Sequence, residues 1–226
     1  MQKQIHILPS ILAADYGHIV DELKRVEEAG TEILHVDIMD GHFVPNLSFG
    51  PDFVAMLREN TKMHLDTHLM LQQPDRYARA FIEAGADTLT VHLEAYHDVK
   101  RTLRTIKEMG CRTGLALNPL TLFENCVSLL KEVDLLLCMT VNPGFGGQHF
   151  IIEVLEKVRQ ARAWRKEKGL DYDIEVDGGL NSETVGPSVA AGANLIVAGS
   201  SVFGEKDAEA AIKLLKSRAA EVQAGG

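Results

Sequence analysis

The sequence has no excess of positive charge, no long apolar run and few cysteines. Its formal net charge is −9, which argues against nonspecific binding to nucleic acid or to an anionic membrane, because both attract basic surfaces. No apolar run approaches the roughly 20 residues of a membrane-spanning helix. The acidic balance leaves a phosphorylated ligand open, because backbone N–H groups can bind a phosphate without a lysine.

The three cysteines, Cys111, Cys126 and Cys138, include no CxxC pair and are too few for a disulfide framework. We expect them to be small buried hydrophobic residues of a protein in a reducing compartment. No signal or transit segment is expected, because strand-like sequence begins at Ile5. A cytoplasmic protein fits these features, and a processed organelle protein would show the same ones.

Short apolar runs rich in β-branched residues recur along the 226 residues, and most are followed by an amphipathic stretch. This alternation, without a linker or a composition shift, predicts a parallel α/β architecture. We predict a single (β/α)8 TIM-barrel domain over residues 1–226, because this length is ordinary for that fold. The expected strands are residues 5–12, 33–39, 63–69, 88–93, 113–117, 135–141, 172–177 and 195–198.

Helical patterns are expected at residues 21–29, 74–84, 99–109, 151–168 and 208–220, and left-handed glycine caps are expected at Gly30, Gly85, Gly110 and Gly192. The alternative architecture is an open doubly wound sheet, which often has a glycine-rich turn after its first strand. Here that strand runs into Ser10 and Asp15 without a glycine cluster. The glycine clusters follow the last three strands, where barrels commonly bind phosphate, so the barrel is favoured.

Histidines and aspartates lie at the carboxyl ends of three expected strands. Strand alternation places His35 and Asp37 on one face of the second strand, and that face points into a barrel because Val36 and Ile38 face the helices. His68 ends the third strand and Asp177 the seventh. Two histidines and two aspartates form a donor set that suits one divalent ion, either zinc, iron, manganese or cobalt. The alternative is a buried polar network without a metal.

Three methionines, Met39, Met70 and Met139, are expected beside this cluster by the same alternation. They are either ordinary core filler or a dry, polarizable active-site wall that protects a carbanion-like intermediate from water.

Three glycine-rich segments follow the last strands, at residues 142–148, 177–179 and 198–201. Glycine lets backbone N–H groups approach an anion closely, so these segments together predict a phosphate site. Taken singly they are ordinary turns. The first segment contains Gly144, Gly146 and Gly147, and we also expect it to be a mobile lid that contacts the substrate.

Six motifs extend over essentially the whole chain. They are PSILAAD (9–15), HVDIMDGHFVPN (35–46), DTHLM (66–70), MTVNPGFGGQ (139–148), EVDGG (175–179) and AGS (198–200). With these motifs the chain resembles the ribulose-phosphate 3-epimerases. Ala13 and Tyr16 differ from the serine and phenylalanine that are frequent in that family. Related allulose-phosphate epimerases tend to lack the second glycine of VDGG, so Gly179 favours a pentose substrate without excluding allulose 6-phosphate.

The resemblance implies metal ligands at His35, Asp37, His68 and Asp177, with Asp37 and Asp177 as the catalytic acid/base pair. It also implies that Ser10 and His68 contact the substrate, and that the phosphate contacts Gly146, Gly147, Gly178, Gly179, Gly199 and Ser200. From its position alone, Ser10 could equally cap the turn that follows its strand.

The implied reaction is the reversible interconversion of D-ribulose 5-phosphate and D-xylulose 5-phosphate, a step of pentose phosphate metabolism. Inversion at C3 through a cis-enediolate needs one acid/base group on each face of the carbon, which two aspartates provide. A metal-dependent hydrolase would have no use for carboxylates on two faces, and a non-catalytic sugar-phosphate sensor would tolerate their loss. We expect a sugar-phosphate partner, no nucleic-acid or membrane partner, and self-association into a homo-oligomer.

Overall fold

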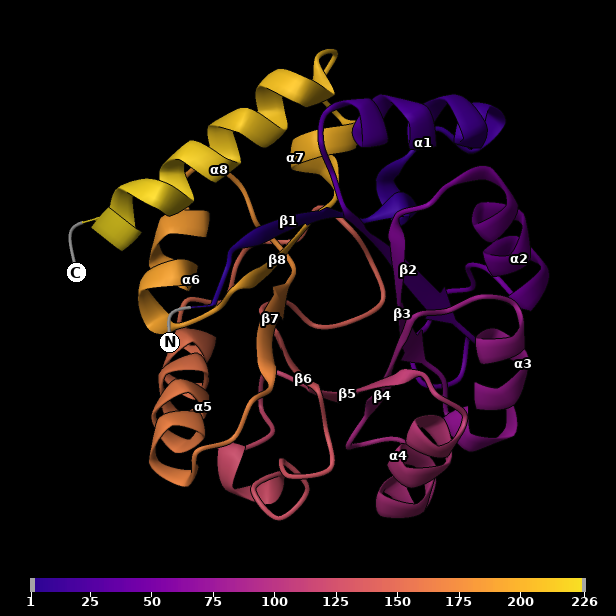
Figure 1. The fold of residues 1–226 in the computed structure, drawn as a ribbon, viewed down its shortest axis with the longest axis vertical. Helices are drawn as coiled ribbons and strands as arrows, with labels where there is room; N and C mark the ends of the chain where they lie inside the picture. Colours follow the sequence, from indigo (N-terminus) through magenta and orange to yellow (C-terminus); the bar gives the residue numbers. More distant parts are fainter. Residues whose placement is uncertain (1–2, 225–226) are drawn as a thin grey trace.

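A central ring of parallel strands forms the structure (Figure 1). The computed structural model describes residues 3–224, so residues 1–2 and 225–226 of the predicted domain lie outside this range. The strands are β1 (His6–Pro9), β2 (Ile33–Met39), β3 (His64–Met70), β4 (Thr88–His92), β5 (Arg112–Leu117), β6 (Leu135–Met139), β7 (Asp173–Asp177) and β8 (Leu195–Ala198). Their order in the sheet is β1-β8-β7-β6-β5-β4-β3-β2. A parallel bridge between Ser10 and His35 joins the two ends of the sheet and closes the barrel.

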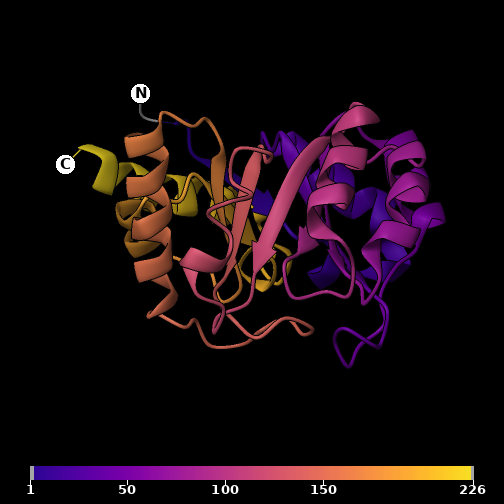
Figure 2. The ribbon, with the colours of Figure 1, turned by 90° about the horizontal axis from the view of Figure 1, so that it is seen from below.

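Helices surround the strands on the outside, as the two perpendicular views show (Figures 1 and 2). The α-helices are α1 (Ile19–Glu28), α2 (Pro51–Asn60), α3 (Ala78–Glu83), α4 (Val99–Glu108), α5 (Val154–Lys168), α6 (Val185–Ala191), α7 (Ser200–Phe203) and α8 (Ala208–Ala224). Short 3-10 helices are η1 (Ile11–Ala13), η2 (Tyr16–His18), η3 (Pro74–Arg76) and η4 (Phe123–Asn125). The predicted (β/α)8 barrel is therefore confirmed, with η4 in place of an α-helix between β5 and β6.

Glycines end several helices as the sequence predicts. The four expected caps all have positive φ angles, namely Gly30, Gly85, Gly110 and Gly192. This left-handed conformation costs glycine little because it has no Cβ atom.

Some expected boundaries were wrong. The first strand ends at Pro9 rather than at residue 12, because the chain turns into η1 at Ser10. The helix expected at 74–84 is divided at Tyr77 into η3 and α3. Helix α2 (Pro51–Asn60) was not anticipated from the apolar pattern, although Pro51 occupies its first turn, a position that proline favours.

Two layers of buried side chains make up the core. The outer layer lies between strands and helices and includes Val36 and Ile38, which confirms the predicted orientation of β2. The inner layer fills the barrel and is apolar on one side, where Leu8, Leu137 and Val197 pack together. Other inward-facing residues are polar and buried. Those on β2, β3 and β4 are His35, Asp37, Asp66, His68, Thr88, Thr90 and His92, and β7 contributes Glu175. Because burial of so many polar groups is costly, this part of the barrel is where function is expected.

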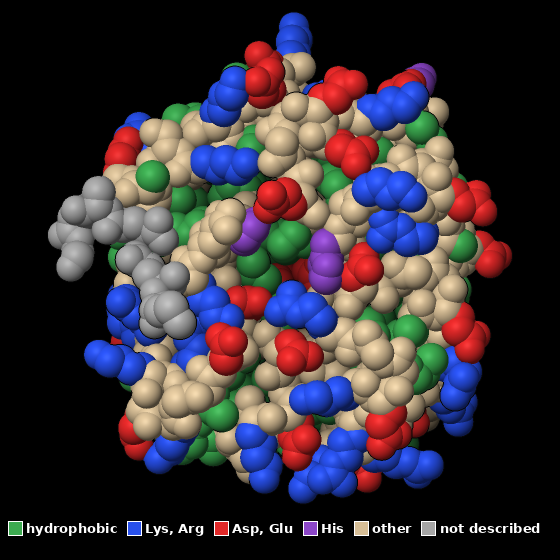
Figure 3. Space-filling model, viewed as in Figure 1, with side chains coloured by type: hydrophobic (Ala, Val, Ile, Leu, Met, Phe, Trp, Pro, Cys, Tyr) green, Lys and Arg blue, Asp and Glu red, His purple; other side chains and the backbone are tan. Residues whose placement is uncertain are grey.

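The surface carries charges of both signs. In Figure 3, lysine and arginine side chains intermingle with aspartate and glutamate around the face that is in view, with no continuous basic area on it. No helix within residues 3–224 combines the length and apolar character needed to cross a bilayer. The three cysteines are buried and unpaired, as expected from the sequence.

Candidate metal centre and active site

The four predicted metal ligands converge inside the barrel. Ligand atoms of His35, Asp37, His68 and Asp177 all lie within 4.8 Å of one another. They come from β2, β3 and β7, and the strand register places Asp37 directly beside His68. The structure thus brings together residues that are up to 142 positions apart in the sequence (177 − 35), at the end of the barrel where active sites of this fold lie.

The spacing of these atoms suits a metal. His35 Nε2 lies 3.3 Å and His68 Nδ1 3.1 Å from the same atom, Asp37 Oδ1. Ligands held about 2.0–2.1 Å from a tetrahedral ion are themselves roughly 3.3 Å apart, so these separations match the edges of such a polyhedron. The donor set and its spacing therefore fit one divalent ion.

The other nitrogen of His35 faces carboxylates. Nδ1 of His35 contacts Asp66 Oδ2 at 2.7 Å and Glu175 Oε1 at 3.3 Å. A carboxylate behind a histidine fixes the ring and the tautomer of a metal ligand. Burial lowers the pKa of His35, but Asp37, Asp66 and Glu175 outweigh burial and raise it well above its usual value. The same negative charge that favours a proton on His35 favours a cation in its place.

Burial favours the neutral form of His68. The ring is completely buried, and burial lowers its pKa to about 4. A neutral imidazole has one nitrogen lone pair available, which metal binding requires. Its Nδ1 faces Asp37, whereas its Nε2 lies 2.8 Å from Nε2 of His92 on β4.

The pKa values of the two aspartates are shifted in opposite directions. Burial favours the protonated form of Asp37, but His35 and His68 hold its pKa well below the usual range. Burial and the nearby charge of Asp37 raise the pKa of Asp177 to about 7. Ser10 donates a hydrogen bond of 2.6 Å to Asp37 Oδ2, and its hydroxyl caps no turn. The alternative role of Ser10 as a helix cap is therefore wrong.

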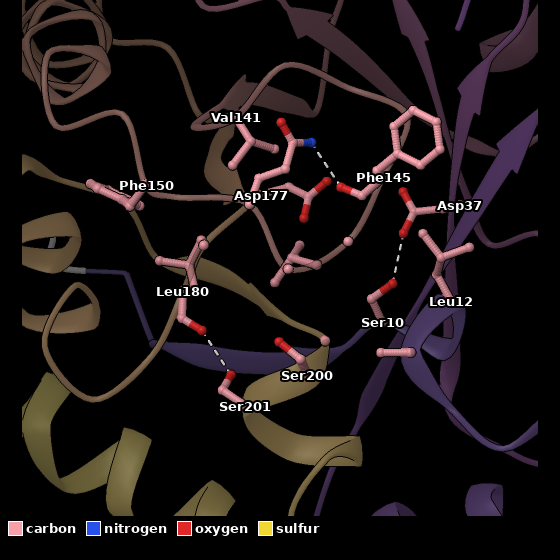
Figure 4. A pocket seen from close by; sticks show the side chains of 18 of the residues that line it. Ser10, Leu12, Asp37, Val141, Phe145, Phe150, Asp177, Leu180, Ser200 and Ser201 are labelled. Atoms are coloured by element: carbon pink, nitrogen blue, oxygen red, sulfur yellow. Dashed lines mark hydrogen bonds between the residues drawn. The ribbon is translucent and has the colours of Figure 1, made fainter. Parts of the chain in front are cut away.

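A cavity of about 760 Å³ opens at this end of the barrel. In Figure 4, Asp37 and Asp177 lie on opposite sides of the same space, and Ser10 points toward Asp37. All the predicted site residues line the cavity except His35 and His68. Those two histidines lie behind its wall and are fully buried. The predicted contact between His68 and the substrate stays a prediction, since the placement of this ring suits a metal ligand.

The three methionines are buried in the cavity wall. Met39 and Met70 pack with Val44 and partly buried Leu12, whereas Met139 belongs to the apolar interior with Leu137. They are thus apolar lining, and their role in protecting an intermediate stays a prediction.

The glycine-rich loop after β6 covers part of the cavity. Asn46, in the loop after β2, donates a hydrogen bond of 2.7 Å from Nδ2 to the Gly144 carbonyl. Gln148 Nε2 donates to the carbonyls of Asn142 (2.6 Å) and Phe145 (2.8 Å), which braces the loop internally. The Phe145 side chain stands beside the cavity in Figure 4. Two loops therefore meet over the site, and the predicted mobility of the second one stays a prediction.

Glycines of three loops line one region of the cavity, as predicted. They are Gly144, Gly146, Gly147, Gly178, Gly179 and Gly199, with Ser200 beside them. A Cβ atom on Gly179 would lie 2.8 Å from the backbone nitrogen of Phe150, and its φ is +69°. Close packing therefore explains this glycine. No lysine or arginine within residues 3–224 lines the cavity, so an anion there would depend on backbone N–H groups and hydroxyls.

Four functional candidates were missed in the sequence. Asp66 and Glu175 lie in the quoted motifs, and strand alternation would have placed them on the inward face beside His35. His92 ends β4 on the face of Thr88 and Thr90, so the same rule could have found it. Glu94 follows that strand in a loop, where no periodic signal exists.

The fold and this site define an enzyme of the (β/α)8-barrel class with a candidate metal centre at the carboxyl ends of its strands. Residues 6–203 match the model of the "Ribulose-phosphate 3 epimerase family". The chain belongs to this family, whose members are isomerases.

Several curated relatives agree with this assignment. Ribulose-phosphate 3-epimerase from Bacillus subtilis (strain 168) is 48% identical over 213 residues, which cover 94% of this chain and 98% of that protein. The Escherichia coli (strain K12) enzyme of the same name is 42% identical, over 97% and 98% of the two chains. The chloroplastic ribulose-5-phosphate-3-epimerase of Arabidopsis thaliana is 44% identical, over 96% of this chain and 78% of that protein.

Solved structures of low sequence identity share the fold. 3-Hexulose-6-phosphate synthase from Salmonella typhimurium superposes with a TM-score of 0.72 at 16% identity, over 96% of this chain and 100% of that one. 3-Keto-L-gulonate-6-phosphate decarboxylase from Vibrio cholerae gives a TM-score of 0.72 at 14% identity, over 98% and 99%. These similarities support the barrel architecture.

Proposed function

We propose that this epimerase interconverts D-ribulose 5-phosphate and D-xylulose 5-phosphate by moving a proton between Asp37 and Asp177 across C3. The observation that carries the proposal is the placement of these two carboxyl groups on opposite sides of one cavity, within a donor set that fits a divalent ion. Inversion requires removal of a proton from one face of C3 and its return to the other, so a single base is not sufficient.

The C3 proton is too weakly acidic for a carboxylate to remove unaided. His35, Asp37, His68 and Asp177 would hold one divalent ion, namely zinc, iron, manganese or cobalt. When bound, this ion supplies Lewis-acid stabilisation for the negative charge that develops on the C2 and C3 oxygens.

Different protonation states of the two aspartates suit them to opposite roles. Asp37 is held ionised by His35 and His68 and by the Ser10 hydroxyl, so it starts as the base. Asp177 has a raised pKa of about 7 and can start as the acid. In the reverse reaction the roles exchange. Because the two groups interact, their titration belongs to the pair.

Positioning comes from the loops. The phosphate group would lie on the glycine segments after β6, β7 and β8, and the loop that carries Gly144 and Phe145 would close over the sugar. Binding energy from the remote phosphate can then orient C3 between the aspartates. Met39, Met70 and Met139 present apolar surface to the cavity, which would keep water away from the carbanion-like intermediate.

The test is solvent deuterium exchange at C3. Purified protein is incubated with D-ribulose 5-phosphate in D2O, and the sugars are followed by NMR. We expect deuterium at C3 of both epimers, with D-xylulose 5-phosphate as the product. A hydrolase would release inorganic phosphate without C3 exchange, and a sensor would do neither. Either of those results would refute the proposal.

The remaining expectations are part of the same proposal. The substrate and product belong to pentose phosphate metabolism. The unpaired buried cysteines agree with a cytoplasmic, reducing environment. We also propose that the chain forms a homo-oligomer, which sedimentation of the purified protein would reveal.

A further inference from the structure

A series of hydrogen-bonded side chains leads from the candidate metal centre to the loops that follow β4 and β5. His68 Nε2 lies 2.8 Å from His92 Nε2, and His92 Nδ1 lies 3.1 Å from Glu94 Oε2. The other oxygen of Glu94 accepts hydrogen bonds from the Asn118 backbone N–H at 2.7 Å and from the Thr121 hydroxyl. Neither His92 nor Glu94 lines the cavity, so neither can contact the substrate there.

We propose that Glu94 and His92 are positioning residues, which fix the tautomer of His68 so that its Nδ1 lone pair points toward the metal. This inference rests on the metal role of His68 in the proposed function. According to this inference, His92 and Glu94 also determine the affinity of the site for its metal ion.

With Glu94 ionised and a cation rather than a proton between His68 Nδ1 and Asp37 Oδ1, the hydrogen-bond pattern permits only one assignment of protons. A carboxylate can only accept, so Nδ1 of His92 carries the proton that it donates to Glu94. Neutral His92 then has a lone pair on Nε2, which can accept only from a protonated Nε2 of His68. Neutral His68 consequently has its lone pair on Nδ1, the atom that faces Asp37. The negative charge of Glu94 thus fixes the tautomer of His92, and His92 in turn fixes the tautomer of His68. We call this hydrogen-bonded series of Glu94, His92 and His68 the relay.

Surrounding residues hold the His92 ring and the loop that orients Glu94 in place. His92 is completely buried, and its ring lies against Phe43 with centroids 4.6 Å apart. The loop that supplies the Asn118 N–H is itself anchored, because Lys157 Nζ donates hydrogen bonds to the carbonyls of Asn118 (2.6 Å) and Pro119 (3.2 Å). A ring that cannot rotate cannot escape a wrong tautomer by reorientation. Replacement of the Glu94 carboxylate should therefore change the affinity of the site for a metal ion.

Glu94→Gln is the decisive variant, because it keeps the size and shape of the side chain, removes its negative charge and reverses the proton pattern. The amide oxygen of glutamine can replace the oxygen that accepts from Asn118 and Thr121, which turns the NH2 group toward His92. Nδ1 of His92 must then accept, Nε2 becomes the donor, and His68 is forced into the tautomer with a proton on Nδ1. That tautomer has no lone pair for the metal. The opposite orientation of the amide would place its NH2 group against the Asn118 N–H.

The matched control is Thr121→Val, which removes one donor to Glu94 but leaves its carboxylate and His92 intact. Affinity for Zn²⁺ and Co²⁺ is measured by competition with a chromophoric chelator. The visible spectrum of the Co²⁺ protein reports the ligand geometry. We expect Glu94→Gln to weaken binding 10- to 100-fold and to alter the Co²⁺ spectrum, and Thr121→Val to bind within about threefold of the parent, as expected for a group outside the relay.

A double-mutant cycle tests whether the effect passes through His92. His92→Phe removes the relay, so adding Glu94→Gln to it should weaken binding no further. Thermal unfolding of the metal-free proteins shows whether each variant still folds. Parental affinity in folded Glu94→Gln, or a full additional loss in the double variant, would overturn the relay while leaving the epimerase proposal intact. A parent protein that binds neither metal would overturn the relay and the role of His68 as a ligand for these ions, whereas the C3 exchange assay tests the epimerase activity separately.

Discussion

The hydroxyl of Ser10 donates a 2.6 Å hydrogen bond to Oδ2 of Asp37, while Oδ1 of the same carboxylate faces His35 and His68. The two carboxylate oxygens of Asp37 therefore have different partners. Oδ1 belongs to the metal side, and Oδ2 is held by a hydroxyl that borders the cavity. Ser10 also pairs with His35 where β1 and β2 close the barrel, so the bond is fixed by the fold itself.

Loss of the Ser10 hydroxyl should therefore impair proton transfer more than metal binding. A hydrogen bond to a charged group contributes about 1.5–3 kcal/mol, so we expect Ser10→Ala to lower kcat/KM roughly 10- to 100-fold with unchanged metal content. Ser201→Ala is the matched control, because that hydroxyl also borders the cavity but donates to the Leu180 carbonyl (Figure 4). Equal rates for Ser10→Ala and the parent would remove Ser10 from the mechanism.

Removal of the metal should abolish epimerisation. Without a cation, the negative charge that develops at C3 has no positive partner among the cavity-lining residues of the described chain, which include no lysine or arginine. The protein is treated with a strong chelator, its metal content is verified, and divalent ions are then restored one at a time. We expect activity to return with at least one of zinc, iron, manganese and cobalt. Full activity in the verified metal-free protein would exclude the Lewis-acid role.

Replacement of one aspartate should leave exchange on one face only. Asp37→Asn and Asp177→Asn should each lower turnover by roughly 100- to 10,000-fold, the usual contribution of an acid/base group. The remaining carboxylate can still remove and return the proton that faces it. Each variant should thus exchange C3 deuterium with one epimer, and the two variants should select opposite epimers. Metal content must be measured in parallel, because both residues are proposed ligands. Near-parental turnover in a metal-loaded variant would contradict the two-base scheme.

The raised pKa of Asp177 predicts a stability cost in the metal-free protein. Because its pKa rises from 3.8 to about 7 on folding, the folded state holds a proton that the unfolded state has lost between these pH values. The free energy of unfolding therefore falls as pH rises from 4 to 7. Asp177→Asn removes this dependence. Since Asp177 is only partly buried, we expect the variant to be more stable than the parent by about 2 kcal/mol at pH 8 and by little at pH 4.

Urea unfolding of both proteins in chelator, at several pH values, measures this difference. Glu183→Gln is a suitable control, because it removes an exposed carboxylate from the same cavity. A constant difference between Asp177→Asn and the parent across the pH range would show that Asp177 ionises normally in the folded chain.

Strand alternation was enough to predict which side chains of β2 face the candidate site. The two-residue period placed His35 and Asp37 on one face and Val36 and Ile38 on the other, because every β2 side chain must choose between the barrel interior and the helices. The barrel rule then placed Asp177 at the same end. These predictions did not require interatomic distances, since a parallel barrel brings the carboxyl ends of all its strands to the same end of the molecule.

What could not be predicted depends on partners distant in the sequence. The end of β1 at Pro9 follows from the closure between Ser10 and His35, which no local pattern records. The role of Glu94 could not be predicted either. Its partner His92 is close in sequence, but the Asn118 N–H that orients its carboxylate lies 24 residues away in another loop. Alternation shows which face a residue occupies, but the register between strands decides which side chain it meets.

The phosphate should contribute to catalysis through the glycine loops. Several backbone N–H groups on a phosphate could supply about 4 kcal/mol, so D-ribulose 5-phosphate should exceed free D-ribulose roughly thousandfold in kcat/KM. Inorganic phosphite should partly restore turnover of the free sugar. Gly179→Ala places a Cβ atom 2.8 Å from the Phe150 nitrogen, whereas a Cβ on Gly146 meets no atom within 4 Å. Gly179→Ala should therefore reduce the thousandfold advantage of the phosphorylated sugar, and Gly146→Ala should preserve most of it. If Gly179→Ala lowered the rates of both sugars equally, the loop after β7 would be a structural turn and the phosphate would have to lie elsewhere.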